Sequence, residues 1–218
     1  PYFSPTDMGV NMAGYCIFDD DAVKKAAERE ILRRYYQTAV AEKRCGSDGS
    51  QTQKMELMLN RAEIATTVRP VIAAAAARAE VSGSPAGALE LPDGDIVTGK
   101  TTTLLEATAA LLLNALKRLA GIDQETDIIS PQALEPICNL KVRHLHHKNP
   151  RLHADEVLIA LSISSTRNAD AAKALEQLEK LRGCDAHYTV ILSRMDEKTH
   201  KALGIYATSE PKYEVKPV

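Results

Sequence analysis

The sequence predicts an α/β fold in which an N-terminal helical subdomain precedes a three-layer α/β/α domain. Two observations carry this prediction. Apolar residues recur at helical spacing in the first third of the chain, and beyond residue 87 segments of strand character alternate with helical ones. We therefore expect a helical subdomain over residues 1–81, a linker over residues 82–87 and an α/β domain over residues 88–218.

The helical subdomain is predicted from capping residues and spacing. Acidic residues 19–21 offer an N-cap, apolar side chains then recur every four residues from Val23 to Ala39, and Gly46 provides a stop. Residues 55–62 space as a second helix, and Pro70 can begin a third that runs through an alanine stretch. Small residues and proline over 82–87 indicate a linker or long loop.

Residues 94–101 read G-D-I-V-T-G-K-T, which satisfies the phosphate-loop pattern G-x-x-x-x-G-K-[ST]. The context argues against such a loop. Residues 88–91 alternate like a strand, residues 92–95 supply turn chemistry, and residues 95–98 have the character of a returning strand. We therefore predict a β-hairpin here, and only Gly99, Lys100 and Thr101 retain a potential anion-binding role.

The remaining elements of the α/β domain are predicted from the spacing of apolar residues and from residues that begin or end helices. A long helix ends at Gly121, and Pro131 can open another. The best strand by composition is 157–163. The predicted elements are helix 102–120, strand 127–129, a helix from 131, strand 157–163, helix 169–181, strand 188–192, helix 196–203 and strand 205–207.

Composition limits the classes of partner. The 27 basic and 29 acidic residues give a net charge of −2, and the chain has no Trp and two Phe, so neither a nucleic-acid backbone nor stacked bases are expected partners. The longest apolar stretch contains Glu106, Asn114 and Lys117, so no membrane span is expected. Four scattered cysteines indicate reduced thiols and a cytoplasmic protein.

The beginning of the chain has unusual features. Pro1 stands in place of an initiator methionine, so we expect a fragment of a longer protein. The segment that follows carries two glycines beside polar side chains, a composition suited to a close-packed loop. It could line a cleft shared with the absent part of the protein, or it could be a connector. The residues concerned are Thr6, Asp7, Gly9, Asn11 and Gly14.

Several long segments resemble a known bacterial family. They are residues 4–14 (S-P-T-D-M-G-V-N-M-A-G), 91–101 (L-P-D-G-D-I-V-T-G-K-T), 109–122, 148–164 and 187–193, in the family's order. The chain resembles the C-terminal half of members of domain of unknown function 1846. The resemblance implies that a missing N-terminal half, with its own Gly-rich G-P-G-S-G-K segment, is a partner of this chain. It implies no particular activity.

The predicted order of elements also resembles the cytidine-deaminase-like fold. That fold holds zinc with H-x-E at the start of the helix after the hairpin, and with P-C-x-x-C at the start of the next helix. Here these positions read Gly99-Lys100-Thr101-Thr102-Thr103 and Ser130-Pro131-Gln132-Ala133-Leu134. Neither offers a thiolate or an imidazole, so we expect a deaminase-like architecture without its zinc motifs, and neither a metal nor another cofactor.

Polar and cationic residues follow the predicted strands. If those strands are parallel, their ends converge at helix N-termini, where phosphate or carboxylate can bind. Ordinary helix capping is the alternative explanation for the hydroxyls. The candidate anion-binding residues are Gly99, Lys100, Thr101, Thr102, Ser130, Ser164, Ser165, Thr166, Arg167, Asn168, Ser193 and Arg194.

Three functions stay open on this evidence. The chain could be part of a two-part enzyme that acts on a phosphorylated metabolite, or a non-catalytic module that senses an anionic small molecule. It could also be an assembly domain whose helices at 21–43 and 51–65 form an interface in a homo-oligomer. His144 and His147, at i, i+3 spacing, are a weaker candidate metal pair, for which a solvated helix end is the favoured explanation.

Overall fold

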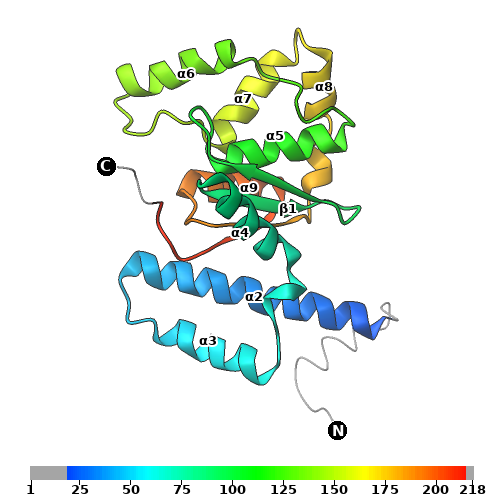
Figure 1. Ribbon diagram of the computed structural model, residues 1–218, viewed down its shortest axis with the longest axis vertical. Coiled ribbons are helices and arrows are strands. Elements are labelled where there is room, and N and C mark those ends of the chain that lie inside the picture. Colours follow the sequence, from blue (N-terminus) through cyan, green and yellow to red (C-terminus); the bar gives the residue numbers. More distant parts are fainter. Residues whose placement is uncertain (1–18, 215–218) are drawn as a thin grey trace.

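The computed structural model describes residues 19–214 and shows a mixed α/β protein (Figure 1). Within this range lie eight α-helices, two short 3-10 helices and one four-stranded sheet, so the predicted α/β class is confirmed. The helices are α2 (Asp20–Cys45), α3 (Ser50–Arg61), α4 (Pro70–Ser82), α5 (Ala107–Leu119), α6 (Pro131–Arg143), α7 (Ala154–Ser164), α8 (Ala169–Leu175) and α9 (Arg194–Leu203), with η1 (Thr66–Val68) and η2 (Leu178–Leu181). The predicted cleft loop, Thr6 to Gly14, lies outside the described residues.

The sheet is mostly antiparallel. Its strands are β1 (Ala86–Glu90), β2 (Ile96–Lys100), β3 (Asp185–Tyr188) and β4 (Tyr206–Ser209), in the spatial order β2-β1-β3-β4. β1 pairs antiparallel with both β2 and β3, and only β3 and β4 run parallel. β2 and β4 therefore form the two edges of the sheet.

The β1–β2 hairpin confirms that G-D-I-V-T-G-K-T is not a phosphate loop. The amide of Leu91 donates to the carbonyl of Asp95 at 2.8 Å, which closes the turn, and Gly94 adopts φ 87, which suits a glycine. Ile96 to Lys100 then pair with β1 along their whole length. This segment is an extended strand rather than a loop, so its amides cannot wrap a phosphate as the loop pattern requires.

Helices cover both faces of the sheet (Figure 1). Because successive side chains of a strand point to opposite faces, Ala88 packs with Val71 of α4 on one side while the neighbouring Leu89 enters the main core with α5 on the other. Gly99 of β2 faces α5 at very short range, since a Cβ there would lie 2.3 Å from the backbone nitrogen of Leu111. The main core is therefore built between the sheet, α5, α7 and α8.

α2 and α3 lie side by side at one end of the molecule, as the sequence predicts for helices in the first third (Figure 1). Asp19 caps α2 by accepting from the amide of Ala22, and Gly46 ends it with φ 66. α2 is joined to the α/β part by ion pairs. These join Arg29 to Glu90 at 3.0 Å, Arg33 to Asp185 at 3.0 Å and Arg44 to Glu197 at 2.8 Å.

A buried ion pair fastens the chain ahead of α4 to the sheet. Arg69 is fully buried, and its Nε and Nη2 donate to Asp185 of β3 at 2.8 and 3.0 Å. Nη2 also donates to the hydroxyl of Thr208 on β4 at 2.8 Å. The paired geometry offsets the cost of removing both charges from water.

The segment predicted as a linker is a short connection. Gly83 ends α4 with φ 63, and β1 already begins at Ala86. α4 itself packs on the sheet although it precedes the predicted boundary. The division of the chain into domains at residues 81 and 88 stays a prediction.

Two predicted strands are absent and a third is misplaced, since β3 spans Asp185–Tyr188 and shares only Tyr188 with the predicted strand 188–192. Residues 157–163 belong to α7, where acidic Asp155 and Glu156 fill the first turn and Glu156 accepts from the amide of His153 at 2.8 Å. A continuous apolar run suits a buried strand and a buried helix equally, and here the helix-start signals decide. Residues 127–129 form no strand. Among the described residues the deaminase-like arrangement of strands is therefore not confirmed.

Candidate functional site

The predicted anion-binding residues are divided between two cavities and several helix ends. The prediction assumed parallel strands and a strand over residues 157–163, and the structure contradicts both premises. Thr101, Ser193 and Arg194 line one cavity, whereas Lys100 and Thr102 line another. Gly99 is buried against α5.

The remaining candidates serve helix ends. Ser165 and Thr166 donate to carbonyls in the last turn of α7, at 2.7 and 2.8 Å, and Asn168 caps α8 by accepting from the amide of Asp170. Ser130 is the N-cap residue of α6, and Arg167 is exposed next to the cap of α8. Ser164 is the last residue of α7. Helix capping, the alternative explanation at the sequence level, accounts for Ser165, Thr166 and Asn168.

The N-termini of three helices meet at one cavity of about 390 Å³, which we call the His153 pocket. Its lining includes the N-cap residues of α5, α7 and α9, which are Glu106, His153 and Ser193. No side chain of the described residues caps α5, so the first amides of that helix are left for another acceptor. Such a meeting of helix N-termini favours negative charge.

A buried carboxylate holds the imidazole of this pocket. Oδ2 of Asp196 lies 2.8 Å from Nδ1 of His153 and accepts from the hydroxyl of Ser193 at 2.6 Å. Oδ1 accepts from the hydroxyl of Thr108 at 2.9 Å and from the amide of Ala154 at 3.0 Å. Four donors therefore surround a carboxylate that is only 3% exposed.

These contacts set the charges of both groups. Burial raises the pKa of Asp196, but the hydrogen bonds from His153, Ser193 and the Ala154 amide outweigh it and hold that pKa at about 2. Hydrogen bonding to Asp196 raises the pKa of His153, against the opposing effect of burial. Since Asp196 is ionised at neutral pH, Nδ1 of His153 is the protonated nitrogen and Nε2 is the one that gains and loses a proton.

The opposite edge of the imidazole is available to a ligand. The His153 side chain is 25% exposed and lines the pocket, and no described residue is hydrogen-bonded to Nε2. A carboxylate that fixes one nitrogen of a histidine and leaves the other facing a cavity is an arrangement compatible with general acid–base catalysis.

Thr101 adds an unused donor to the same pocket. The residue is 6% exposed, and within the described part of the chain its buried hydroxyl has no hydrogen-bond partner. A buried hydroxyl without a partner is costly, so such a group is often completed by a bound molecule. Its amide is occupied by the carbonyl of Pro85, which fixes the position of the residue.

Charged side chains surround the pocket. Glu106 accepts from the side chain of Asn149 at 2.6 Å and lies 3.7 Å from Arg151. Arg44 is occupied by Glu197 and by the carbonyl of Leu192. Arg194, at the start of α9, is exposed and forms no ion pair with the described residues. It is the cation best placed to meet an incoming anion.

Sequence reasoning identified Thr101, Ser193 and Arg194 but missed His153, Asp196 and Glu106. Ser193 itself holds Asp196 in place, since its hydroxyl both donates to the carboxylate and accepts from the Asp196 amide. The missed residues share one feature that could have identified them, since each lies at the start of a helix. His153 was not recognised as a helix N-cap because the segment that follows it was interpreted as a strand.

No metal centre is built by the described residues. Residues 19–214 contain no group of three or more His, Cys, Asp or Glu side chains arranged to hold an ion. His144 and His147 are exposed just after α6. Over the same range, no helix combines the length and apolar character needed to cross a bilayer.

Comparison with protein families identifies the chain's relatives. Residues 67–218 match "Domain of unknown function DUF1846, C-terminal", and residues 1–63 match "Domain of unknown function DUF1846, N-terminal". The chain belongs to the DUF1846 family. The resemblance expected from its sequence segments is therefore confirmed, and α2 and α3 lie wholly within the residues that match the family's N-terminal domain.

Relatives cover nearly the whole of this chain. UPF0371 proteins from Corynebacterium aurimucosum, Corynebacterium urealyticum and Streptococcus thermophilus are 51%, 52% and 49% identical to it, over 97%, 98% and 98% of its length. The same matches cover 42%, 43% and 43% of those proteins. The chain thus spans less than half the length of these DUF1846 relatives, and their name states no activity.

Proposed function

We propose that the His153 pocket binds a small anionic molecule, phosphate or carboxylate in character, and transfers a proton to or from it through Nε2 of His153. The observation that carries this proposal is the His153–Asp196 pair beside the buried, unpartnered hydroxyl of Thr101. The uncapped N-terminus of α5 and the free guanidinium of Arg194 supply the attraction for negative charge.

Each group has a distinct role in this proposal. Asp196 holds the imidazole in one tautomer and stabilises its protonated form. His153 acts as the general base when neutral and as the general acid when protonated, and the hydrogen bond to Asp196 raises its pKa above the ordinary 6.5. Thr101 donates to the bound molecule, and Arg194 pairs with its negative charge.

Catalysis, as distinct from ligand binding alone, is proposed for the longer protein rather than for this chain by itself. Relatives are more than twice as long as the chain, so we assign this pocket to a two-part cytoplasmic enzyme in which the remaining part completes the substrate site. A sensing module is the second candidate. It would use the same anion contacts without turnover.

Ligand binding can be tested on the full chain. In ¹H–¹⁵N spectra, inorganic phosphate and acetate should shift the His153 ring signals, and Thr101→Val and Arg194→Met should each weaken the effect about tenfold. His144→Asn, which alters an exposed histidine after α6, is the matched control for His153→Asn. Unchanged His153 signals at high anion concentration would overturn the proposal.

Turnover separates the enzyme from the sensor. The full-length protein, screened against phosphate esters and carboxylates, should lose about 10²-fold or more of any activity found on His153→Asn, as expected for a general acid–base. Full activity in that variant would contradict a catalytic role. Binding without turnover by the wild type would support the sensor.

An assembly role has one observation in its favour. Leu57 and Met58 of α3 are 59% and 62% exposed, and α3 lies at the end of the molecule (Figure 1). We propose a homo-oligomer through this helix as a separate candidate function. Sedimentation of the full chain and of Leu57→Lys should then give different masses, whereas identical monomers would exclude it.

A further inference from the structure

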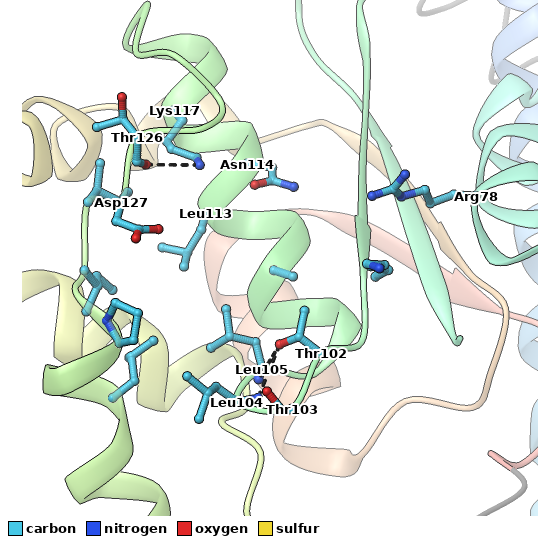
Figure 2. Close-up of a pocket in the computed structure, with 16 residues that line it drawn as sticks. Arg78, Thr102, Thr103, Leu104, Leu105, Leu113, Asn114, Lys117, Thr126 and Asp127 are labelled. Carbon is cyan, nitrogen blue, oxygen red and sulfur yellow. Dashed lines mark hydrogen bonds between the residues drawn. The ribbon is translucent and has the colours of Figure 1, made fainter. Parts of the chain in front are cut away.

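A second cavity, which we call the edge pocket, lies against the open side of β2. It has a volume of about 320 Å³ and is formed between β2, α5 and residues 126–134 (Figure 2). β2 is an edge strand, and its Thr98 carbonyl is met by the side chain of Asn114 from α5 at 2.9 Å rather than by another strand. The pocket therefore occupies a place where a sheet would otherwise expose unpaired backbone groups.

The edge pocket is separate from the His153 pocket. Lys100 and Thr102 line the edge pocket, whereas Thr101 between them and Glu106 beyond them line the His153 pocket. Consecutive residues at the end of β2 thus reach opposite cavities, as the alternation of side chains along an extended chain dictates. The two cavities are therefore treated as two separate binding sites.

Lys117, at one end of the edge pocket, already has hydrogen-bond acceptors for its ammonium group. Nζ of Lys117 donates to the carbonyls of Gln124 and Thr126, and the charge of Asp127 acts on the same ammonium (Figure 2). Burial lowers the pKa of Lys117, and Asp127 opposes that effect. This end offers no free cation to a ligand.

Two further cations line the pocket without an anionic partner among the described residues. Lys100 and Arg78, from β2 and α4, form no ion pair with any described residue, and the buried Nε of Arg78 has no hydrogen-bond acceptor there. In Figure 2, Arg78 lies at the opposite side of the view from Lys117 and Thr126. Uncompensated cations and a buried donor in one cavity favour an anion, which Arg can bind through two nitrogens.

Part of the pocket wall is apolar. In Figure 2, Leu113 lies below Lys117, and Leu104 and Leu105 lie beside Thr102 and Thr103; Ile128, Ile129 and Leu134 complete the apolar part of the lining. A cavity of this size with an apolar wall and a few polar groups is typical of small-molecule sites. Free phosphate would leave this wall in contact with water, whereas an apolar chain attached to an anion would cover it.

We propose that the edge pocket binds a small amphipathic carboxylate. Its carboxylate pairs with Lys100 and Arg78, and its aliphatic chain packs on the leucines and isoleucines of the wall. This site is independent of the acid–base chemistry proposed for the His153 pocket, since it shares no lining residue with it.

Calorimetric titration of the full chain with octanoate tests this assignment. Wild type should bind one octanoate per chain, and Lys100→Met and Arg78→Met should each weaken binding about tenfold. Lys198→Met on α9 removes the same charge at an exposed position outside both pockets and should have no effect. Octanol, which has the chain without the charge, should bind at least about tenfold more weakly.

Three results would overturn the proposal. They are no octanoate binding to wild type at millimolar concentration, equal affinity of wild type and both Met variants, and loss of octanoate binding in His153→Asn with retention in Lys100→Met. The last would place the carboxylate in the His153 pocket. If a Met variant is unfolded, ¹³C-carboxyl octanoate bound to wild type gives the answer, because pairing with the two cations must lower its pKa below that of free octanoate.

Discussion

Nδ1 of His153 lies 2.8 Å from Oδ2 of Asp196, although the two residues are 43 positions apart in the chain. His153 begins α7 and Asp196 lies in the first turn of α9, so the contact joins two helix starts. The same carboxylate also accepts from the Ala154 amide and from Thr108 of α5. Asp196 therefore fixes three helix N-termini around one pocket as well as orienting the imidazole.

The stability of the protein should depend on Asp196 in acid. Its pKa is about 2 in the folded protein against an ordinary 3.8, so ionised Asp196 stabilises the fold by about 2 kcal/mol above pH 5. This contribution is lost as the pH falls through 3.8 toward 2. Urea unfolding should show Asp196→Asn about 2 kcal/mol less stable than wild type near pH 7, with about half that difference near pH 3. An equal difference at both pH values would contradict the assignment.

The contribution of His153 to stability should decrease as the pH rises, opposite to that of Asp196. Its pKa is raised in the folded protein, so protonated His153 stabilises the fold below the ordinary pKa of 6.5, and this contribution disappears as the pH rises through the folded value. The stability difference between wild type and His153→Asn should shrink between about pH 5.5 and pH 9. His144→Asn controls for a general histidine effect, and a difference that grows with pH would exclude the ion pair.

Arg69 should contribute strongly to the stability of the fold. Arg69→Met leaves Asp185 buried without its main partner, because Arg33 alone then remains in contact with it. We expect a loss of about 3 kcal/mol or more in urea unfolding, typical of a broken buried ion pair. Arg34→Met, at an exposed pair with Glu30, should cost less than about 1 kcal/mol. Adding Asp185→Leu to Arg69→Met should recover part of the loss, and no recovery would argue against charge burial as its cause.

Gly99 should tolerate no side chain. In Gly99→Ala the new Cβ would lie 2.3 Å from the backbone nitrogen of Leu111, and a helix backbone moves aside at greater cost than a flexible side chain. We expect α5 to shift and the protein to lose about 2 kcal/mol or more in thermal or urea unfolding. Thr98→Ala, on the same strand, is the control. A Gly99→Ala protein as stable as that control would show that α5 and β2 are less tightly packed.

The local features of the fold could be predicted from the sequence where turn and capping chemistry was strong. The turn at Asp93–Gly94 identified the hairpin and excluded a phosphate loop, and Gly46 marked the end of α2. The run from Val157 was predicted as a strand because composition does not separate a buried strand from a buried helix. The cap from Glu156 to His153 resolves it, and that bond depends on the folded backbone.

The candidate site could be predicted only in part for a related reason. Thr101, Ser193 and Arg194 were identified from their positions next to predicted strands and helices. Nothing in the sequence around His153 or Asp196 distinguishes either residue. Only the packing of α7 against α9 brings Nδ1 of His153 to 2.8 Å from Oδ2 of Asp196. Lys100 was identified as an anion ligand, yet the alternation along β2 sends it to a different pocket from Thr101.

The central claim is that His153 is held by Asp196 at Nδ1 and exchanges its proton at Nε2 within the pocket. An NMR titration of the ring nitrogens of ¹⁵N-labelled histidine tests it directly. The account predicts a His153 pKa above 6.5 with Nε2 as the titrating nitrogen, and a lower pKa in Asp196→Asn. A His153 pKa at or below 6.5, or titration at Nδ1, would contradict the account.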